Sequence, residues 1–364
     1  MHELSEKHKA EFLKQVKNIN TKDESKVKDK IQKEIDELKA KKNTKLSSLI
    51  EKAELFSNIL KCDEFPISET SRKWIIFGLN YLVSDVDLIP DAIPVIGYTD
   101  DNLILSWVTS LISKDIERYN HYLKAKNNSS TLLNEVVQGS GEQQFLFFPG
   151  FFETKDKNHN NLDWVKLIRS IKSVYDSPGI SILDWKFDFL KEFRNTLPMI
   201  DHKLSLKPIF DSEAFDLEWK QLKIEMSILG KKIEDELSNN KLQYPDKEVI
   251  AICLNVGSSP LVEAQYLSDS KLVDEIYLFG ATCTEQKLVD SIAEKGIKVY
   301  NFYSDNDHAL KFIYDNYEQQ NIPTGLGELH SLKTTGIINI DISDSINKHQ
   351  EYRYNFAELI NKAK

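Results

Sequence analysis

The sequence has few cysteines. Only Cys62, Cys253 and Cys283 occur among its 364 residues, and their spacing matches neither a disulfide framework nor a metal-ligand motif. Two of them, Cys253 and Cys283, lie in or just after apolar segments typical of strands. We therefore expect no disulfides, no metal and no cofactor, and a reducing cytoplasm as the compartment.

Long apolar runs are also missing. The two longest apolar stretches, Trp74–Val83 and Leu103–Ile112, are each about half of the ~20 residues that a membrane-spanning helix needs. The first fifteen residues are polar and contain no apolar signal core. The sequence thus predicts a soluble, cytoplasmic protein without a transmembrane segment.

An excess of basic charge is absent from the chain as a whole. Lys and Arg number 47 against 57 Asp and Glu, so the net charge is −10, which excludes nucleic acid as a partner. Residues 1–50 differ, because thirteen Lys stand against nine Asp and Glu there. The N-terminus is therefore interpreted as a distinct region.

Residues 1–62 predict amphipathic, charged helices. From Val27 to Leu38 the apolar residues recur three or four positions apart, and Leu46–Leu60 shows the same pattern. Both polar faces mix charges of either sign, so packing within the chain is favoured over membrane-surface binding. A protein partner for these N-terminal helices remains an open alternative.

Residues 63–126 predict a helical hairpin of Ser71–Val83 and Asp100–Lys124 around a segment broken by Pro90 and Pro94. This segment resembles the short bacterial YkvA-type domain. The resemblance is carried by residues Asp87, Ile89, Pro90, Asp91, Ile93, Pro94, Gly97, Asp100 and Asp101.

Aspartates are concentrated in this hairpin. Asp85, Asp87 and Asp91 precede Asp100 and Asp101, and together their carboxylates would suit a hard cation. Asp100 and Asp101, however, stand at the expected start of a helix, where carboxylates cap free N–H groups. Helix capping is therefore favoured over metal binding.

After a linker expected at residues 127–143, with at most one short helix, strands and helices alternate over residues 144–364. Several strands are continuously apolar, as in a parallel sheet covered on both faces. We predict an α/β-hydrolase-like, mostly parallel sheet with helices on both faces. A charged helical insertion at 197–246 is interpreted as a cap or lid. The expected strands are residues 145–148, 180–185, 249–254, 275–279, 298–302 and 337–342.

The turn after the strand that ends at Leu254 is where such a fold carries its nucleophile, in the pattern G-x-S-x-G. We place the turn at Gly257, with Asn255 and Ser259 as the small flanking residues. In this frame a glycine replaces the nucleophilic serine.

Residues 144–362 resemble the hydrolase-like family of the transmembrane-and-coiled-coil-domain proteins. The resemblance is carried by Phe148-Pro149-Gly150-Phe151 with Trp164, Leu183-Asp184-Trp185-Lys186, Phe279-Gly280-Ala281, Tyr303-Ser304-Asp305-Asn306-Asp307, and His349 with Tyr352-Arg353. It implies Asp307 as the triad acid, His349 as the triad histidine and Gly257 at the serine position. The turn at Gly150, Phe151 and Phe152 would supply oxyanion donors, and with Asn255 these residues are the candidate binding residues.

Two hypotheses follow. In the first, the fold is a catalytically degenerate pseudoenzyme that acts in binding or regulation, and a lipid-like or ester ligand is open to it by family analogy. In the second, the protein is an active serine esterase or lipase that uses Ser258 or Ser259 with His349 and Asp307. A water activated directly by Asp307 and His349 is a further alternative. His330 is a weaker candidate histidine, because it precedes the last expected strand.

Overall fold

The structure is a computed structural model, and it describes residues 4–84, 99–150, 162–185, 189–191, 193, 195, 213–243, 245–317, 323–330 and 336–363. The chain divides into two compact units, Met1–Lys124 and Ala125–Lys364. Each unit is described by itself. In the described part of the chain, no helix is both long and apolar enough to cross a membrane.

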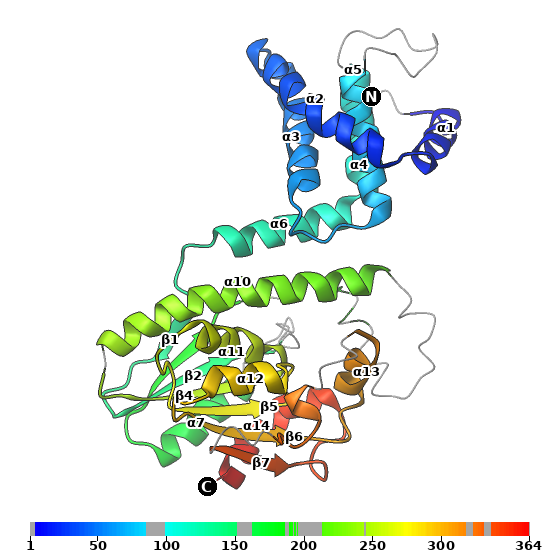
Figure 1. The fold of residues 1–364 in the computed structure, drawn as a ribbon. Helices are drawn as coiled ribbons and strands as arrows, with labels where there is room; N and C mark the ends of the chain where they lie inside the picture. The colour runs from blue at the N-terminus through cyan, green and yellow to red at the C-terminus, as the bar shows by residue number, and fades with distance from the viewer. Residues whose placement is uncertain are drawn as a thin grey trace. The chain divides into compact units, whose positions relative to one another are not determined.

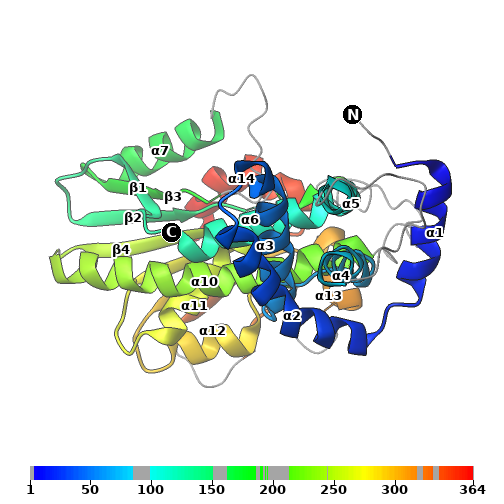
Figure 2. The same ribbon diagram turned by 90° about the horizontal axis from the view of Figure 1, so that it is seen from above.

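The first unit is helical. Its elements are α1 (Glu6–Lys17), α2 (Thr21–Ala40), η1 (Thr44–Leu46), α3 (Ser47–Lys61), α4 (Glu69–Val83), α5 (Thr99–Leu111) and α6 (Ser113–Asn127). The predicted apolar stripe of α2 is buried, with Val27, Ile31, Ile35 and Leu38 at most 1% exposed. It packs against α3 and α4, as an internal face does. Helices α4 and α5 run side by side (Figures 1 and 2).

The helix predicted over residues 100–124 is divided at Ile112 into α5 and α6, which corrects that prediction. In Figure 1, α6 turns away from the direction of α5. The buried Arg118 of α6 pairs with Asp115 of the same helix at 2.5 Å and donates to the carbonyl oxygen of Pro66 at 2.7 Å, so it attaches α6 to the segment before α4. The apolar spacing continues across Ile112, so the sequence pattern does not show the break.

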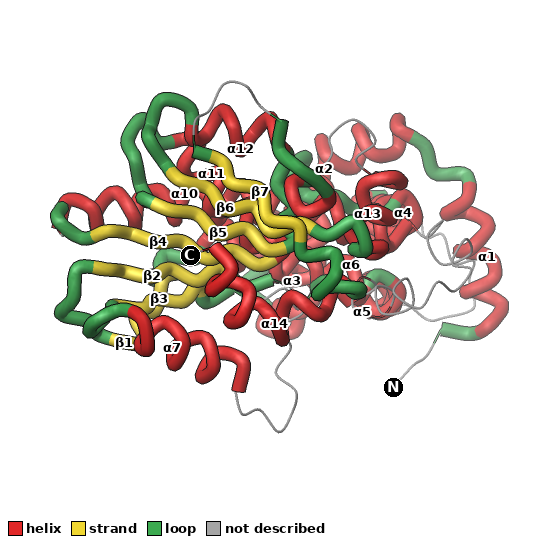
Figure 3. Tube along the Cα trace, turned by 90° about the horizontal axis from the view of Figure 1, so that it is seen from below, coloured by secondary structure: helices red, strands yellow, loops and turns green. Residues whose placement is uncertain are grey.

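The second unit contains a seven-stranded sheet in the order β1-β3-β2-β4-β5-β6-β7 (Figure 3). All neighbouring strands are parallel except β1 and β3. The predicted α/β fold and its six predicted strands are therefore present. The strands are β1 (Leu133–Val137), β2 (Gln143–Phe148), β3 (Gly179–Leu183), β4 (Glu248–Leu254), β5 (Glu275–Phe279), β6 (Lys298–Tyr303) and β7 (Ile337–Asp341).

Helices cover both faces of the sheet. On one face, α7 (Leu162–Val174) and α14 (Tyr352–Leu359) pack; the other face carries α10 (Glu213–Gln243), α11 (Ser258–Leu267), α12 (Glu285–Ile292) and α13 (His308–Tyr317) (Figure 1). Alternate residues of each strand enter the two cores. In β4, Cys253 faces the α10 side and Leu254 faces the α7 side. Short 3-10 turns complete the unit: η2 (Asn255–Gly257), η3 (Thr324–Leu326), η4 (His349–Glu351) and η5 (Ile360–Ala363).

The expected linker contains a strand, which corrects the interpretation of residues 127–143. Residues Leu133–Val137 form β1, the antiparallel neighbour of β3. The Glu236 carboxylate accepts hydrogen bonds from the backbone N–H groups of Leu132 and Leu133, at 2.6 and 3.0 Å. This strand is stabilised by partners more than forty residues away, so its polar local sequence resembles a loop.

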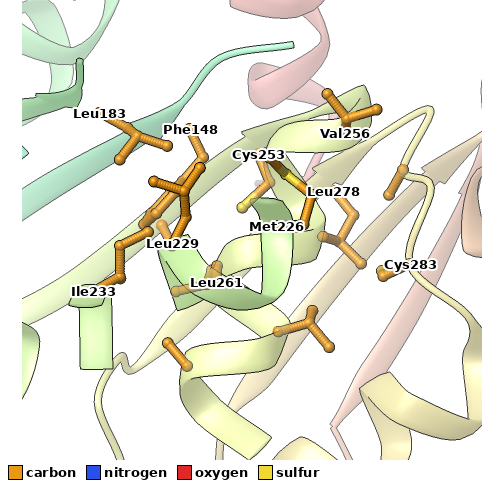
Figure 4. Packing of buried hydrophobic residues seen from close by; sticks show 14 of the residues in the cluster. Phe148, Leu183, Met226, Leu229, Ile233, Cys253, Val256, Leu261, Leu278 and Cys283 are labelled. Atoms are coloured by element: carbon orange, nitrogen blue, oxygen red, sulfur yellow. The ribbon is translucent and has the colours of Figure 1, made fainter. Parts of the chain in front are cut away.

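The described part of the predicted helical insertion is α10, and α10 packs against the sheet as part of the hydrophobic core. Seven of its side chains belong to the same buried cluster as Cys253 of β4 and Leu278 of β5. Figure 4 shows Met226, Leu229 and Ile233 of α10 packed among residues of these strands and of α11. A lid must leave its site without unfolding the core, so the lid interpretation is wrong for residues 213–243.

Candidate functional site

The strand order reverses direction at β2. From β2 the chain proceeds to β3 on one side and later to β4 on the other, so loops diverge above the carboxyl ends of β2 and β4. In open α/β sheets, ligands bind in the crevice that such a reversal creates. The loop that begins with Pro149 and Gly150 and the turn that begins with Asn255 lie at this point.

The sharp turn between β4 and α11 is centred on Asn255. Its φ is +52°, in the left-handed region that few residues other than Gly, Asn and Asp enter. Gly257 instead has φ −62° and ψ −18°, an ordinary helical conformation. The prediction that Gly257 occupies the strained position of the turn is therefore wrong. That position is occupied by Asn255, two residues earlier in the chain.

Gly257 is required by close approach rather than by backbone conformation. A Cβ atom at this position would lie 2.2 Å from the carbonyl oxygen of Phe148 and 2.6 Å from that of Pro149. Gly150 in the same loop is also crowded, because its Cβ would lie 3.0 Å from Asn255 Nδ2. Gly257 is thus the small residue two positions after the turn, and the pattern G-x-S-x-G corresponds to Cys253-Leu254-Asn255-Val256-Gly257.

Asn255 is 2% exposed, and in the described part of the chain its Oδ1 accepts no hydrogen bond. Its carbonyl oxygen accepts from the N–H group of Thr282, at 3.4 Å, and from the hydroxyl of Ser258, at 2.7 Å. The backbone of the turn is therefore fixed on both sides. A buried amide oxygen without a bond marks a place where a water or a ligand group is expected.

The hydroxyl of Ser258 supports this turn. It is fully buried, donates to the Asn255 carbonyl, and accepts from the backbone N–H groups of Thr282 and Cys283, at 3.2 and 3.4 Å. Ser259 forms a 3.1 Å hydrogen bond with the hydroxyl of Thr282 and lines a cavity between α10 and α11. Both hydroxyls already have partners within the loops around α11.

The structure brings His349 and Asp307 together. His349 Nδ1 lies 2.7 Å from Asp307 Oδ2, and the two side chains are 1% and 0% exposed. Asp307 follows β6, and His349 follows β7, so both come from the carboxyl edge of the sheet. A carboxylate at one ring nitrogen orients an imidazole and leaves the other nitrogen directed away from it.

Asp307 also caps a helix. Its Oδ1 accepts from the N–H group of Leu310 at 2.9 Å, at the start of α13. The two loops of the pair are tied together as well, because the hydroxyl of Ser304 donates to the carbonyl of Ile346 at 2.8 Å. Asp307 therefore has two roles in the structure, as a helix cap and as the partner of His349.

Tyr352 is a site residue whose role the sequence did not indicate, although it belongs to the matched His349 motif. Its ring lies beside that of His349, with centroids 6.0 Å apart. It also presses on Gly280, where a Cβ would lie 2.5 Å from the ring and where φ is +52°. Burial and the nearby Asp307 charge raise the pKa of the Tyr352 hydroxyl well above its usual value. A glycine directly after β5 thus makes room for Tyr352 at the carboxyl edge.

The remaining candidates lie elsewhere. Phe151 and Phe152, and the aspartates at 85, 87 and 91, fall outside the described residues. Asp100 lies in the first turn of α5 and accepts from the Tyr81 hydroxyl at 3.1 Å. His330 is exposed, and its backbone N–H donates to Glu285. In the described ranges, no group of three or more His, Cys, Asp or Glu could hold a metal ion.

The cysteines are not activated. Cys253 and Cys283 are buried, and burial raises the pKa of both thiols. Reactive cysteines need a lowered pKa and some exposure. Neither of these two thiols therefore has the properties of a reactive cysteine.

The sheet order, the helices on both faces and the residues at the carboxyl edge make residues 125–364 an α/β domain. Residues 71–107 match DUF1232, a family described as a protein of unknown function, and residues 214–364 match DUF726, described in the same words. The first match contains all the residues, from Asp87 to Asp101, that carry the YkvA-type resemblance. The second contains Asn255, Asp307 and His349. No curated protein matches the chain.

Proposed function

We propose that residues 125–364 form a catalytically degenerate α/β-hydrolase-like domain that binds its ligand without cleaving it. The observation that carries this proposal is Asn255. It stands on the left-handed turn between β4 and α11, where hydrolases of this fold carry their nucleophile. With the corrected register, the proposal rests on an asparagine in that position rather than on Gly257.

An asparagine cannot replace serine in this chemistry. Covalent catalysis of this kind uses a hydroxyl, thiol, amine or carboxylate that a base or its surroundings can activate. The carboxamide of Asn255 has no group that loses a proton to His349 to become a nucleophile. It is, however, suited to hold a hydroxyl or carbonyl group, because it offers both a donor and an acceptor.

His349 and Asp307 do not require catalysis to explain their arrangement. Asp307 stabilises α13 through Oδ1 and the His349 loop through Oδ2. Since both bonds are buried, replacement of either residue would leave polar groups without partners. The pair therefore has a structural role that remains after a nucleophile is lost.

A hydrolytic function is supported less well. Ser258 would need to give up three hydrogen bonds and full burial to reach a substrate. Direct activation of a water is the stronger second candidate, because His349 is oriented by Asp307 and the open Oδ1 of Asn255 could position that water. This second candidate predicts slow hydrolysis without a covalent intermediate.

The decisive variant is Asn255→Ser. It places a hydroxyl on the turn residue, and we expect the variant to react with a serine-directed fluorophosphonate while the parent chain does not. Asn255→Ser with His349→Ala should lose the labelling, because the base is removed. Mass spectrometry of the labelled peptide identifies the modified residue.

Gly257→Ser is the matched control, since it introduces the same hydroxyl two residues later. Its Cβ would collide with the backbone of Phe148 and Pro149, so it should reduce stability without producing labelling. Labelling of the parent chain at Ser258 or Ser259 would contradict the proposal. Hydrolysis of an activated ester by the unlabelled parent, abolished by His349→Ala, would favour the water-activating alternative.

The helical unit, residues 1–124, is proposed as the part that contacts a protein partner. Leu13 of α1 and Leu111 of α5 are 50% and 47% exposed there, more than apolar side chains in a closed helical core. A lipid-like or ester ligand for the α/β unit remains part of the proposal by family analogy.

A further inference from the structure

A cavity of about 220 Å³ lies on the α10 side of the sheet, apart from His349 and Asp307, neither of which lines it. Its walls come from α10, from the start of α11, from the loop after β5 and from α12 and α13. The wall residues that matter for its chemistry are Trp219, Met226, Val256, Ser259, Thr282 and Tyr314. Figure 4 shows two of these wall residues, Met226 and Val256, within the buried cluster.

The size of the cavity exceeds ordinary packing defects. Protein interiors contain few voids larger than a water molecule, and an apolar cavity of about 150 Å³ is large enough to bind benzene. By the same proportion, about 220 Å³ accommodates roughly nine non-hydrogen atoms. Trp219, Met226, Val256 and Tyr314 are each at most 6% exposed, so the part of the wall that they form is buried and largely apolar.

Polar groups converge at one place in the wall. The hydroxyls of Ser259 and Thr282 lie 3.1 Å apart and share one hydrogen bond. One hydroxyl hydrogen and further lone pairs therefore remain for a ligand. At the rim, Lys287 is paired with Glu263, which also accepts from the hydroxyl of Ser227 at 3.2 Å. Lys223 also lines the cavity, and it has an interaction of its own. Because none of these three charged side chains is without a partner, the cavity favours a neutral ligand.

We propose that this cavity binds a neutral aromatic molecule of about nine non-hydrogen atoms that carries one polar hydrogen, which bonds to the Ser259 and Thr282 hydroxyls. The aromatic side chains of Trp219 and Tyr314 in the wall can pack against the ring of the ligand. The inference deepens the proposed binding function, on which it rests, by naming the place and the chemical class of the ligand. It does not depend on the identity of the residue at position 255.

Indole fits this description and serves as the probe. Titration into the full chain, followed by isothermal calorimetry and ligand-observed NMR, should give saturable binding with Kd below about 1 mM, the range expected for so small a ligand. Ser259→Leu fills the cavity and should abolish binding. Ser259→Ala with Thr282→Val leaves the space but removes both hydroxyls, and should weaken binding about tenfold, the loss of one net hydrogen bond.

Ser238→Ala is the matched control. Ser238 lies on the same helix α10, outside the cavity, and its hydroxyl bonds to Glu234 at 2.9 Å, so its loss should leave indole binding unchanged. Circular dichroism and the denaturation midpoint check that each variant folds. Where Ser259→Leu does not fold, Met226→Trp narrows the cavity from the α10 wall and takes its place.

Absence of saturable binding to the parent chain, or equal affinity in the filled variant, would overturn the cavity proposal. Equal affinity in the Ser259→Ala, Thr282→Val variant would overturn the role of the polar hydrogen. Fluorophosphonate labelling of the parent would overturn the proposed function instead. The two failures are therefore distinguishable, because the covalent probe reports on the turn and indole reports on the cavity.

Discussion

The two halves of the candidate site at the carboxyl edge differ in what they contain. The half built by the loops after β6 and β7 has both its geometry and its chemical groups, with His349 Nδ1 and Asp307 Oδ2 2.7 Å apart. The half after β4 has a sharp left-handed turn, and the side chain on it is that of Asn255. The backbone of this turn is held by its close packing against the loop after β2. The side chain on the turn can change without disturbing that packing.

The largest loss of stability is expected in the half after β4, where Gly257 packs against the backbone of the loop after β2. Gly257→Ala adds a Cβ at 2.2 Å from the Phe148 carbonyl oxygen, a rigid backbone atom that cannot rotate aside. Overpacking of this kind costs about 3 kcal/mol or more in the free energy of unfolding. Urea denaturation of both proteins measures the difference.

Gly327→Ala is the control for that variant. Nothing lies within 4 Å of a Cβ at Gly327, and its φ of −175° is extended backbone that alanine also adopts. We expect a change within about 0.5 kcal/mol, as at an ordinary surface site. Equal stability of the two variants would show that the β2 loop does not approach Gly257 this closely.

In the half built by the loops after β6 and β7, the free energy of unfolding is expected to depend on the side chains. Asp307→Ala removes the cap of α13, worth about 1 kcal/mol, and leaves the buried His349 Nδ1 without its carboxylate, for a further ~1–2 kcal/mol. The total loss in unfolding free energy is therefore about 2–3 kcal/mol. Asp307→Asn retains an acceptor oxygen and should lose less. A loss below 0.5 kcal/mol for Asp307→Ala, measured by denaturation, would indicate that the pair is not structural.

The same contrast explains how far the sequence predicted the site. Asp307 and His349 were singled out through the resemblance of their short motifs to the hydrolase-like family, and each follows a strand that its apolar run makes evident. The turn was misplaced because Asn255 and Gly257 both belong to residue types that enter the left-handed region, and the sequence does not show that only Asn255 has a positive φ. Crowding at Gly257 comes from Phe148, more than a hundred residues away, and local sequence cannot show it.

Among the strands and helices, too, some could be predicted from the sequence and others could not. Strands β2 and β4 are covered on both faces, so their apolar runs were sufficient to predict them. Strand β1 lies at an edge, where Val136 is 49% exposed, and only its pairing with β3 makes it a strand. The length of α10 was partly evident, but the burial of its apolar face against the sheet depends on tertiary contacts. Elements defined by their own pattern were predicted, and those defined by a distant partner were not.

A smaller effect isolates the strain at the turn. Asn255→Ala and Asn255→Gly both remove the buried amide, but alanine must adopt the left-handed conformation at φ +52° while glycine does so without steric cost. The alanine variant should therefore be about 1 kcal/mol less stable than the glycine variant. Comparing two variants cancels the contribution of the amide itself. Equal denaturation midpoints would mean that the turn relaxes when Asn255 is replaced.

The smallest effect at neutral pH concerns Tyr352, which packs on Gly280, directly after β5, and lies beside His349. Its hydroxyl is buried without a hydrogen bond of normal geometry to the described residues, although Asp307 is near enough to raise its pKa. Removal of a buried, unbonded hydroxyl is nearly neutral, so Tyr352→Phe should change the unfolding free energy at pH 7 by less than about 1 kcal/mol.

The effect of Tyr352→Phe should grow with pH. In the unfolded chain Tyr352 ionises near pH 10, while in the folded chain its raised pKa keeps it protonated, so above pH 10 the folded state binds more protons. Stability contributed by this group therefore falls as the pH rises above about 10, and phenylalanine removes that loss. Tyr122 and Tyr277 also have a raised pKa, with burial as the main cause, and they add the same alkaline loss to both proteins. The difference between parent and variant, measured by urea denaturation from pH 8 to 10.5, isolates Tyr352. Parallel stability curves would show that its hydroxyl ionises as readily in the folded state as in the unfolded state, and hence that the carboxyl edge around Asp307 admits water.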